Sequence, residues 1–113
     1  MLAWTYFAGI LFLFIGEMVA MARYMVRIVL HNAEWSEYDI LHEEMRRVGF
    51  SREIIATDGA RYMLPDAMYR IVSQRDRDDI REMASLCAKK SNRQYEVLVL
   101  EYSRSCWSGL EDA

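Results

Sequence analysis

Apolar and polar residues alternate along the chain immediately after Arg23. Arg27 and His31 share the polar side of this segment. The other side carries the apolar side chains of Tyr24, Val26, Ile28 and Leu30. Successive side chains of a strand lie on opposite faces, so the pattern predicts a half-buried strand that ends near His31.

Two further segments place apolar residues at helical spacing. The first begins at Ser36, a favourable N-cap residue with an acid three positions later, and ends at Gly49. The second begins after Asp76, ends near Asn92 and carries two lysines in its last turn. Each helix has one apolar stripe, and we expect the stripes to bury Leu41, Met45, Ile80 and Met83.

Residues that favour strands fill the remaining segments. We predict strands over residues 50–57 and 67–73, joined through the turn pair Asp58-Gly59 and interrupted at Pro65. Residues 95–102 form the last predicted strand. The order β-α-β-β-α-β is that of the ferredoxin-like motif. We therefore predict one α+β domain over residues 23–113, with both helices on one face of a four-stranded antiparallel sheet.

Residues 1–22 are almost continuously apolar, and Glu17 is their only ionisable side chain. A basic segment and a clear cleavage site are both absent, which argues against a signal peptide. As a helix, about 20 residues suffice to cross a membrane. Three interpretations stay open, and the first two are a membrane anchor with the domain on the cytoplasmic side and an upstream extension before a start at Met21. A third is a helix that packs on its own domain or on a second copy.

Composition narrows the class of protein only slightly. A chain of 113 residues, 53% hydrophobic and 27% charged, is typical of one folded domain and excludes a disordered or fibrous protein. The formal charge of -3 neither supports nor excludes an RNA partner. Two cysteines with no ligand-like spacing to either histidine suggest a reducing compartment. We predict a cytoplasmic protein, held at the inner face of the membrane if the anchor inserts, with no metal and no cofactor.

Several short motifs resemble the GhoS-like family of small bacterial proteins. The motifs are RYMVRIVLHNA at 23–33, YDILH at 38–42, GFSR at 49–52, DG at 58–59, LP at 64–65, EVLV at 96–99 and WSGL at 107–110. They are collinear over about residues 23–110. The resemblance implies a ferredoxin-like fold related to CRISPR-associated endoribonucleases. It also implies an antitoxin of a type V toxin-antitoxin pair, which cleaves the messenger RNA of its membrane toxin.

The chemistry that this resemblance implies has few candidate residues. In the related CRISPR-associated proteins an Asp associated with metal closes the first strand, whereas this chain has His31 and Asn32 there. A metal-dependent mechanism is therefore in doubt. An imidazole titrates near neutrality, so we expect His31 to act as a general base, with Arg27 holding phosphate. Arg61 is a second expected RNA contact.

These candidate residues also have purely structural explanations. Polar residues commonly occupy an exposed strand face, so His31 and Arg27 could simply be solvated. We expect His42 to be a half-buried packing residue. Asp58 is the first carboxylate to consider if cleavage needs a metal. No phosphate-binding loop, nucleophile elbow, dinucleotide fingerprint or motif that reads DNA sequence is present.

Two functional hypotheses remain. The first is an endoribonuclease antitoxin that acts on a toxin transcript. The second is a non-catalytic dimeric interaction module, tethered to the membrane through residues 1–22. In either case we expect a homodimer, because an open sheet leaves edges that need covering and the tail from Tyr102 to Leu110 is long enough to reach a neighbour.

Overall fold

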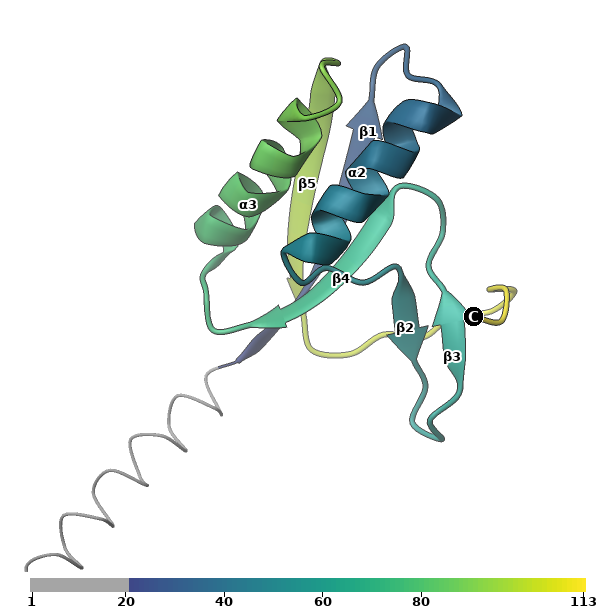
Figure 1. The fold of residues 1–113 in the computed structure, drawn as a ribbon. Coiled ribbons are helices and arrows are strands. Elements are labelled where there is room, and N and C mark those ends of the chain that lie inside the picture. Colours follow the sequence, from purple (N-terminus) through teal and green to yellow (C-terminus); the bar gives the residue numbers. More distant parts are fainter. Residues whose placement is uncertain (1–20) are drawn as a thin grey trace, which may run out of the picture.

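The computed structural model describes residues 21–113, which form five strands and two helices (Figure 1). The elements are β1 (Ala22–Leu30), α2 (Trp35–Arg47), β2 (Glu53–Ile55), β3 (Arg61–Met63), β4 (Met68–Ser73), α3 (Arg77–Lys89) and β5 (Tyr95–Tyr102). The predicted α+β class is confirmed. The expected apolar N-terminal helix over residues 1–22 lies, as far as residue 20, outside the described residues, and Ala22 already belongs to β1. Within residues 21–113, no helix is long and apolar enough to cross a membrane.

The main sheet is antiparallel, with β1 between β4 and β5. Val26, at the centre of β1, lies opposite Tyr69 on one side and opposite Val99 on the other. Because β1 has a neighbouring strand on both edges and its alternate side chains pack in the core, this segment is the most buried part of the sheet.

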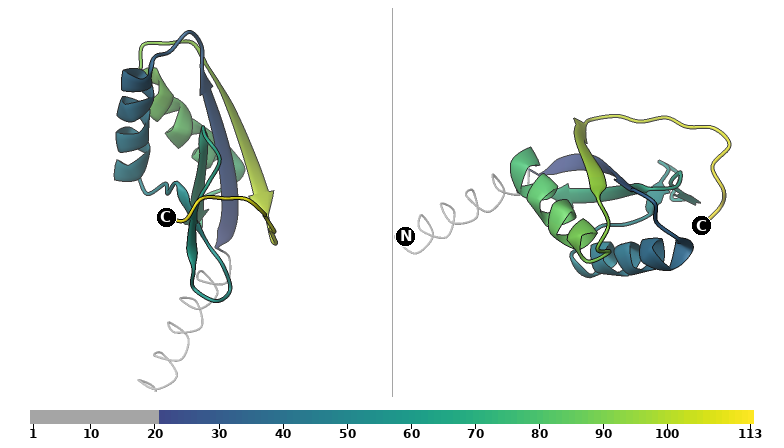
Figure 2. Two further views of the ribbon diagram at one scale, coloured as in Figure 1. Left: turned by 90° about the vertical axis from the view of Figure 1, so that its right-hand side faces the viewer. Right: turned by 90° about the horizontal axis from the view of Figure 1, so that it is seen from above.

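Both helices cover the same face of this sheet, as predicted (Figure 2). Leu41, Met45 and Ile80 are completely buried, whereas Met83 is only partly buried against the core. Burying a side chain such as Leu41 stabilises the fold by about 1.5–3 kcal/mol relative to exposing it. The other face of the main sheet has no helix in the described residues; we call it the open face.

The predicted four-stranded sheet is wrong. Residues 53–55 pair with residues 61–63 in a separate two-stranded sheet, β2–β3, and only a bridge between Ser51 and Arg70 joins this part to β4. Pro65 gives the reason, since it has no N–H to continue the ladder beyond Leu64. Ala67 then adopts a positive φ of 68°, which redirects the chain into β4.

The C-terminal tail returns to its own chain. The Met63 N–H donates to the carbonyl of Glu111 at 2.8 Å, and the Ala113 N–H donates to that of Arg61 at 3.1 Å. The ring of Trp107 packs edge-on against Tyr62, with the centroids 5.7 Å apart. The tail therefore extends the β2–β3 hairpin, and the expectation that it reaches a second copy is not supported.

The helix starts follow capping chemistry. Asp76 caps α3 as predicted, because its Oδ1 accepts a hydrogen bond from the Asp79 N–H at 2.9 Å. Helix α2 begins at Trp35, one residue before the predicted cap Ser36, and its N-cap is Glu34. The Glu37 carboxylate accepts from the Glu34 N–H at 3.3 Å and also pairs with Arg93, whose hydrogen bond lowers the pKa of Glu37.

Candidate functional site

Arg27 lies in the middle of β1 on the open face. Its register neighbours are Met68 on β4 and Leu98 on β5. The side chain is exposed, and within residues 21–113 no carboxylate forms an ion pair with it. Arg27 is thus a cation with its hydrogen-bonding fork available to an anion from solution.

His31 is the first residue after β1, and the fold holds its backbone firmly. The Leu30 N–H donates to the Tyr38 hydroxyl at 2.9 Å, and the His31 N–H donates to the carbonyl of Gln94 at 2.8 Å. Asn32 then takes a φ of 53°, a left-handed conformation that Asn tolerates better than most residues. Hydrogen bonds of the Leu30 and His31 backbone therefore hold the end of β1 that carries the imidazole.

The imidazole of His31 is accessible and has one carboxylate beside it. Nε2 lies 3.7 Å from Oε2 of Glu96, and the two side chains are 45% and 71% exposed. A neighbouring carboxylate can orient an imidazole and stabilise the charge that the ring gains when it accepts a proton. The structure therefore places one accessible imidazole beside one carboxylate at the end of β1.

Arg61 lies apart from these two residues. It belongs to β3, in the two-stranded sheet, and its Nη1 atom lies 3.3 Å from Oε2 of Glu53. The pair is partly exposed, so Arg61 still faces solvent, but a carboxylate already offsets part of its charge. Arg61 and Arg27 therefore lie in different sheets.

His42 occupies a different environment. It is half-buried, as predicted, and its Nδ1 atom lies 2.5 Å from the Tyr69 hydroxyl. Burial, followed by the charge of Arg52, lowers the pKa of His42. No pattern in the sequence indicates the bond to Tyr69, because it joins α2 to a strand 27 residues away.

A cavity of about 530 Å³ borders His42, and its lining includes Arg46, Arg52 and three carboxylates. Opposite charges therefore mix around this imidazole. Across residues 21–113, no group of three or more His, Cys, Asp or Glu side chains is placed to hold a metal ion. The two cysteines are free, and burial raises the pKa of the Cys87 thiol.

Comparison with known proteins assigns the chain to a family. The family model described as endoribonuclease GhoS matches residues 17–104. The chain belongs to the GhoS endoribonuclease family. The match takes in every helix and strand from β1 to β5, begins upstream of the expected start at residue 23, and ends at residue 104, near the start of the tail. A search of curated proteins found no match.

Proposed function

We propose that this member of the GhoS family is an antitoxin that cleaves the messenger RNA of a small membrane toxin. The family match over residues 17–104 carries the proposal. The target transcript and the toxin pairing come from the resemblance of the short motifs across residues 23–110. Residues 1–22 would hold the domain at the inner face of the membrane.

In the proposed reaction, His31 is the general base. It removes the proton of a ribose 2′-hydroxyl, the 2′-oxygen bonds to phosphorus, and the bond from phosphorus to the 5′-oxygen breaks. The leaving 5′-oxygen takes a proton from solvent, so the products are a cyclic phosphate and a 5′-hydroxyl. The Glu96 carboxylate stabilises the imidazolium that forms, which is supported by its 3.7 Å distance from Nε2.

Arg27 has a binding role in this scheme. Residues 27 and 31 are four apart on one strand, which separates their Cα atoms by about 13 Å. Arg27 therefore holds a phosphate beside the reacting one. Its exposure and its freedom from a carboxylate in the described residues support this role. Arg61 would contact RNA farther away, from the β2–β3 hairpin.

The experiment is incubation of the full chain with transcripts of neighbouring genes for small hydrophobic proteins, with and without EDTA. The proposal predicts cleavage of one transcript, 5′-hydroxyl product ends and no effect of EDTA. Absence of cleavage from every transcript would refute the enzymatic function.

A second candidate function is a non-catalytic dimeric module, and the open face favours it. Leu98, Leu100 and Val72 are 55%, 52% and 41% exposed there. Two such faces packed together would bury these side chains and would also cover Arg27. In light scattering at micromolar concentration, Leu98→Asp should then turn a dimer into a monomer, whereas Leu86→Asp on α3, at a residue 53% exposed, should not. A wild-type monomer would remove this candidate.

A further inference from the structure

A groove on the open-face side gathers residues that are far apart in the sequence. Its volume is about 420 Å³, and β1, the β2–β3 hairpin, β4, β5 and the tail contribute to its walls. Three arginines and two aromatic rings line it: Arg23, Arg70, Arg104, Tyr102 and Trp107. We call it the arginine groove.

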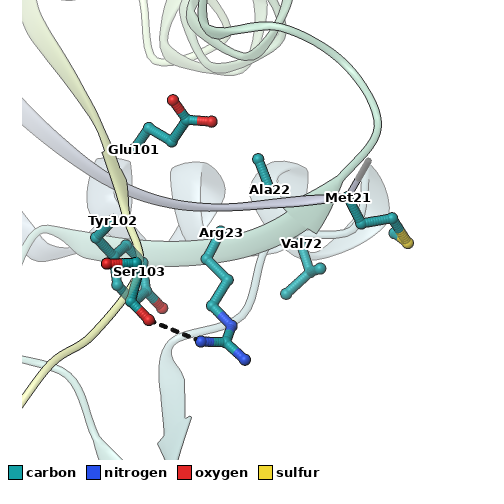
Figure 3. Close-up of a pocket in the computed structure, with 7 residues that line it drawn as sticks. All are labelled: Met21, Ala22, Arg23, Val72, Glu101, Tyr102 and Ser103. Carbon is teal, nitrogen blue, oxygen red and sulfur yellow. Dashed lines mark hydrogen bonds between the residues drawn. The ribbon is translucent and has the colours of Figure 1, made fainter. Parts of the chain in front are cut away.

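The charge of the arginine groove differs from that of the whole chain. The protein carries a net charge of -3, yet among the described residues that line this groove none is acidic. Glu101 borders a neighbouring hollow, and Figure 3 shows its carboxylate on the opposite side of β1 from the guanidinium of Arg23. Charges of one sign in a concave site focus the field toward an anion.

Protein contacts fix two of these three arginines without neutralising them. Arg23 donates to the carbonyl of Ser103 at 2.9 Å (Figure 3), and Nε of Arg70 donates to the Tyr102 hydroxyl at 3.0 Å. Each bond uses one of the several N–H groups of a guanidinium. Arg104 is exposed in the tail. The remaining donors match the oxygens of a phosphate.

The aromatic rings lie beside these charges and remain partly accessible. Tyr102 ends β5, and Trp107 is held by its edge-on contact with Tyr62. Isoleucines 54 and 55 add an apolar wall, and Thr57 and Ser105 add hydroxyls. Cationic side chains that follow a backbone, together with rings on which unpaired bases stack, are the elements of a site for single-stranded nucleic acid.

We propose that the arginine groove binds single-stranded RNA through two or three phosphates and one stacked base. Arg23 and Arg27 lie on the same side of β1. The bound RNA therefore continues from the groove along β1 toward His31. These positions span about 26 Å from Arg23 to His31. The continuation toward His31 rests on the proposed function, whereas binding in the groove requires no cleavage.

The test is fluorescence anisotropy with the full chain and a short 2′-O-methyl RNA, which cannot react at its 2′-oxygen. We expect the Arg23→Ala/Arg104→Ala variant to bind about tenfold or more weakly. The slope of log K against log salt should fall in magnitude by about 1.4, since each phosphate contact on a single strand contributes about 0.7. The control is Arg47→Ala/Arg81→Ala, which removes the same charge from exposed positions on α2 and α3.

Two variants of Tyr102 test whether an RNA base stacks on its ring. Tyr102→Ala should weaken binding about 5- to 100-fold, whereas Tyr102→Phe, which keeps the ring and loses only the bond to Arg70, should bind within about twofold of wild type. The same oligonucleotide annealed to its complement should bind much more weakly, because its bases are not free to stack.

The outcomes separate this inference from the proposed function. If the wild type binds and cleaves RNA and the groove variants behave like the control, the arginine groove is not the binding site. If the wild type binds through the groove and cleaves no RNA, the groove stands and the enzymatic function falls. If the wild type binds no RNA, both are overturned.

Discussion

The two ends of β1 present different kinds of surface. At the His31 end, one accessible imidazole has one carboxylate beside it, 3.7 Å away. At the Arg23 end, arginines and aromatic rings from several segments meet without an acidic residue among the described lining residues. The first arrangement suits the transfer of a proton, and the second suits the binding of a polyanion. The comparison suggests that this fold separates chemistry from binding along a single strand.

The largest expected effect concerns the His31 end. His31→Ala should reduce the cleavage rate about 10²- to 10⁴-fold, because it removes the proposed general base at a position that is exposed and outside the core. Rates on the target transcript, measured under single-turnover conditions, check this prediction. The circular dichroism spectrum and the melting temperature should match those of the wild type.

A metal-dependent reaction would contradict the role proposed for the His31 end of β1. If EDTA abolishes cleavage and His31→Ala does not, the catalytic role moves to a carboxylate. Asp58 is then the first to replace, although its Oδ1 accepts a hydrogen bond from the Ala60 N–H in the hairpin turn, 2.9 Å away. Asp58→Asn would keep most of that turn and remove the charge.

A smaller effect on RNA cleavage is expected from Arg27, which lies between the two ends of β1. Arg27→Ala should raise KM several-fold with little change in kcat, and the salt slope of RNA binding should fall in magnitude by about 0.7. The reason is that Arg27 is exposed on the open face and has no competing carboxylate in the described residues. Equal losses in kcat for Arg27→Ala and His31→Ala would show that the two residues act on the same phosphate.

The smallest expected effect is a pH dependence of stability that comes from His42. Burial lowers the pKa of His42 from its ordinary value of 6.5, so the unfolded chain binds that proton more readily than the folded one. The free energy of unfolding should therefore fall as the pH drops below about 6.5, through the lowered pKa. Glu37 and Glu43, whose pKa values are lowered by Arg93 and Arg46, respond only below about 4.5.

Urea denaturation between about pH 7.5 and pH 5.5 measures this effect. His42→Gln should flatten the dependence, because it removes the group whose pKa burial lowers. A wild type that gains stability over this range as the pH falls would contradict the account of His42.

Amphipathic periodicity predicted much of the fold. The alternation from Tyr24 to Leu30 indicated β1, and the apolar stripes of α2 and α3 indicated two helices on one face. The four-stranded sheet failed because local strand preference does not show which partner a strand takes after Pro65. The return of the tail depends on bonds such as that from Met63 to Glu111, which join distant positions and leave no periodic pattern.

The candidate residues were predictable to a similar extent. Arg27 and His31 belong to one alternating segment, so their spacing alone places them on one side of the sheet. The arginine groove needs the bridge from Ser51 to Arg70 and the path of the tail past β3, which together bring Arg70, Arg104 and Trp107 to one place. Net charge conceals it, because acidic residues elsewhere outweigh its arginines.

The separation of binding from chemistry along β1 is tested most directly by steady-state kinetics on one RNA substrate. The account predicts that Arg23→Ala/Arg104→Ala raises KM about tenfold or more and leaves kcat within about twofold, whereas His31→Ala lowers kcat about 10²-fold or more and leaves KM nearly unchanged. A groove variant that lowers kcat as strongly as His31→Ala, with KM unaltered, would contradict it.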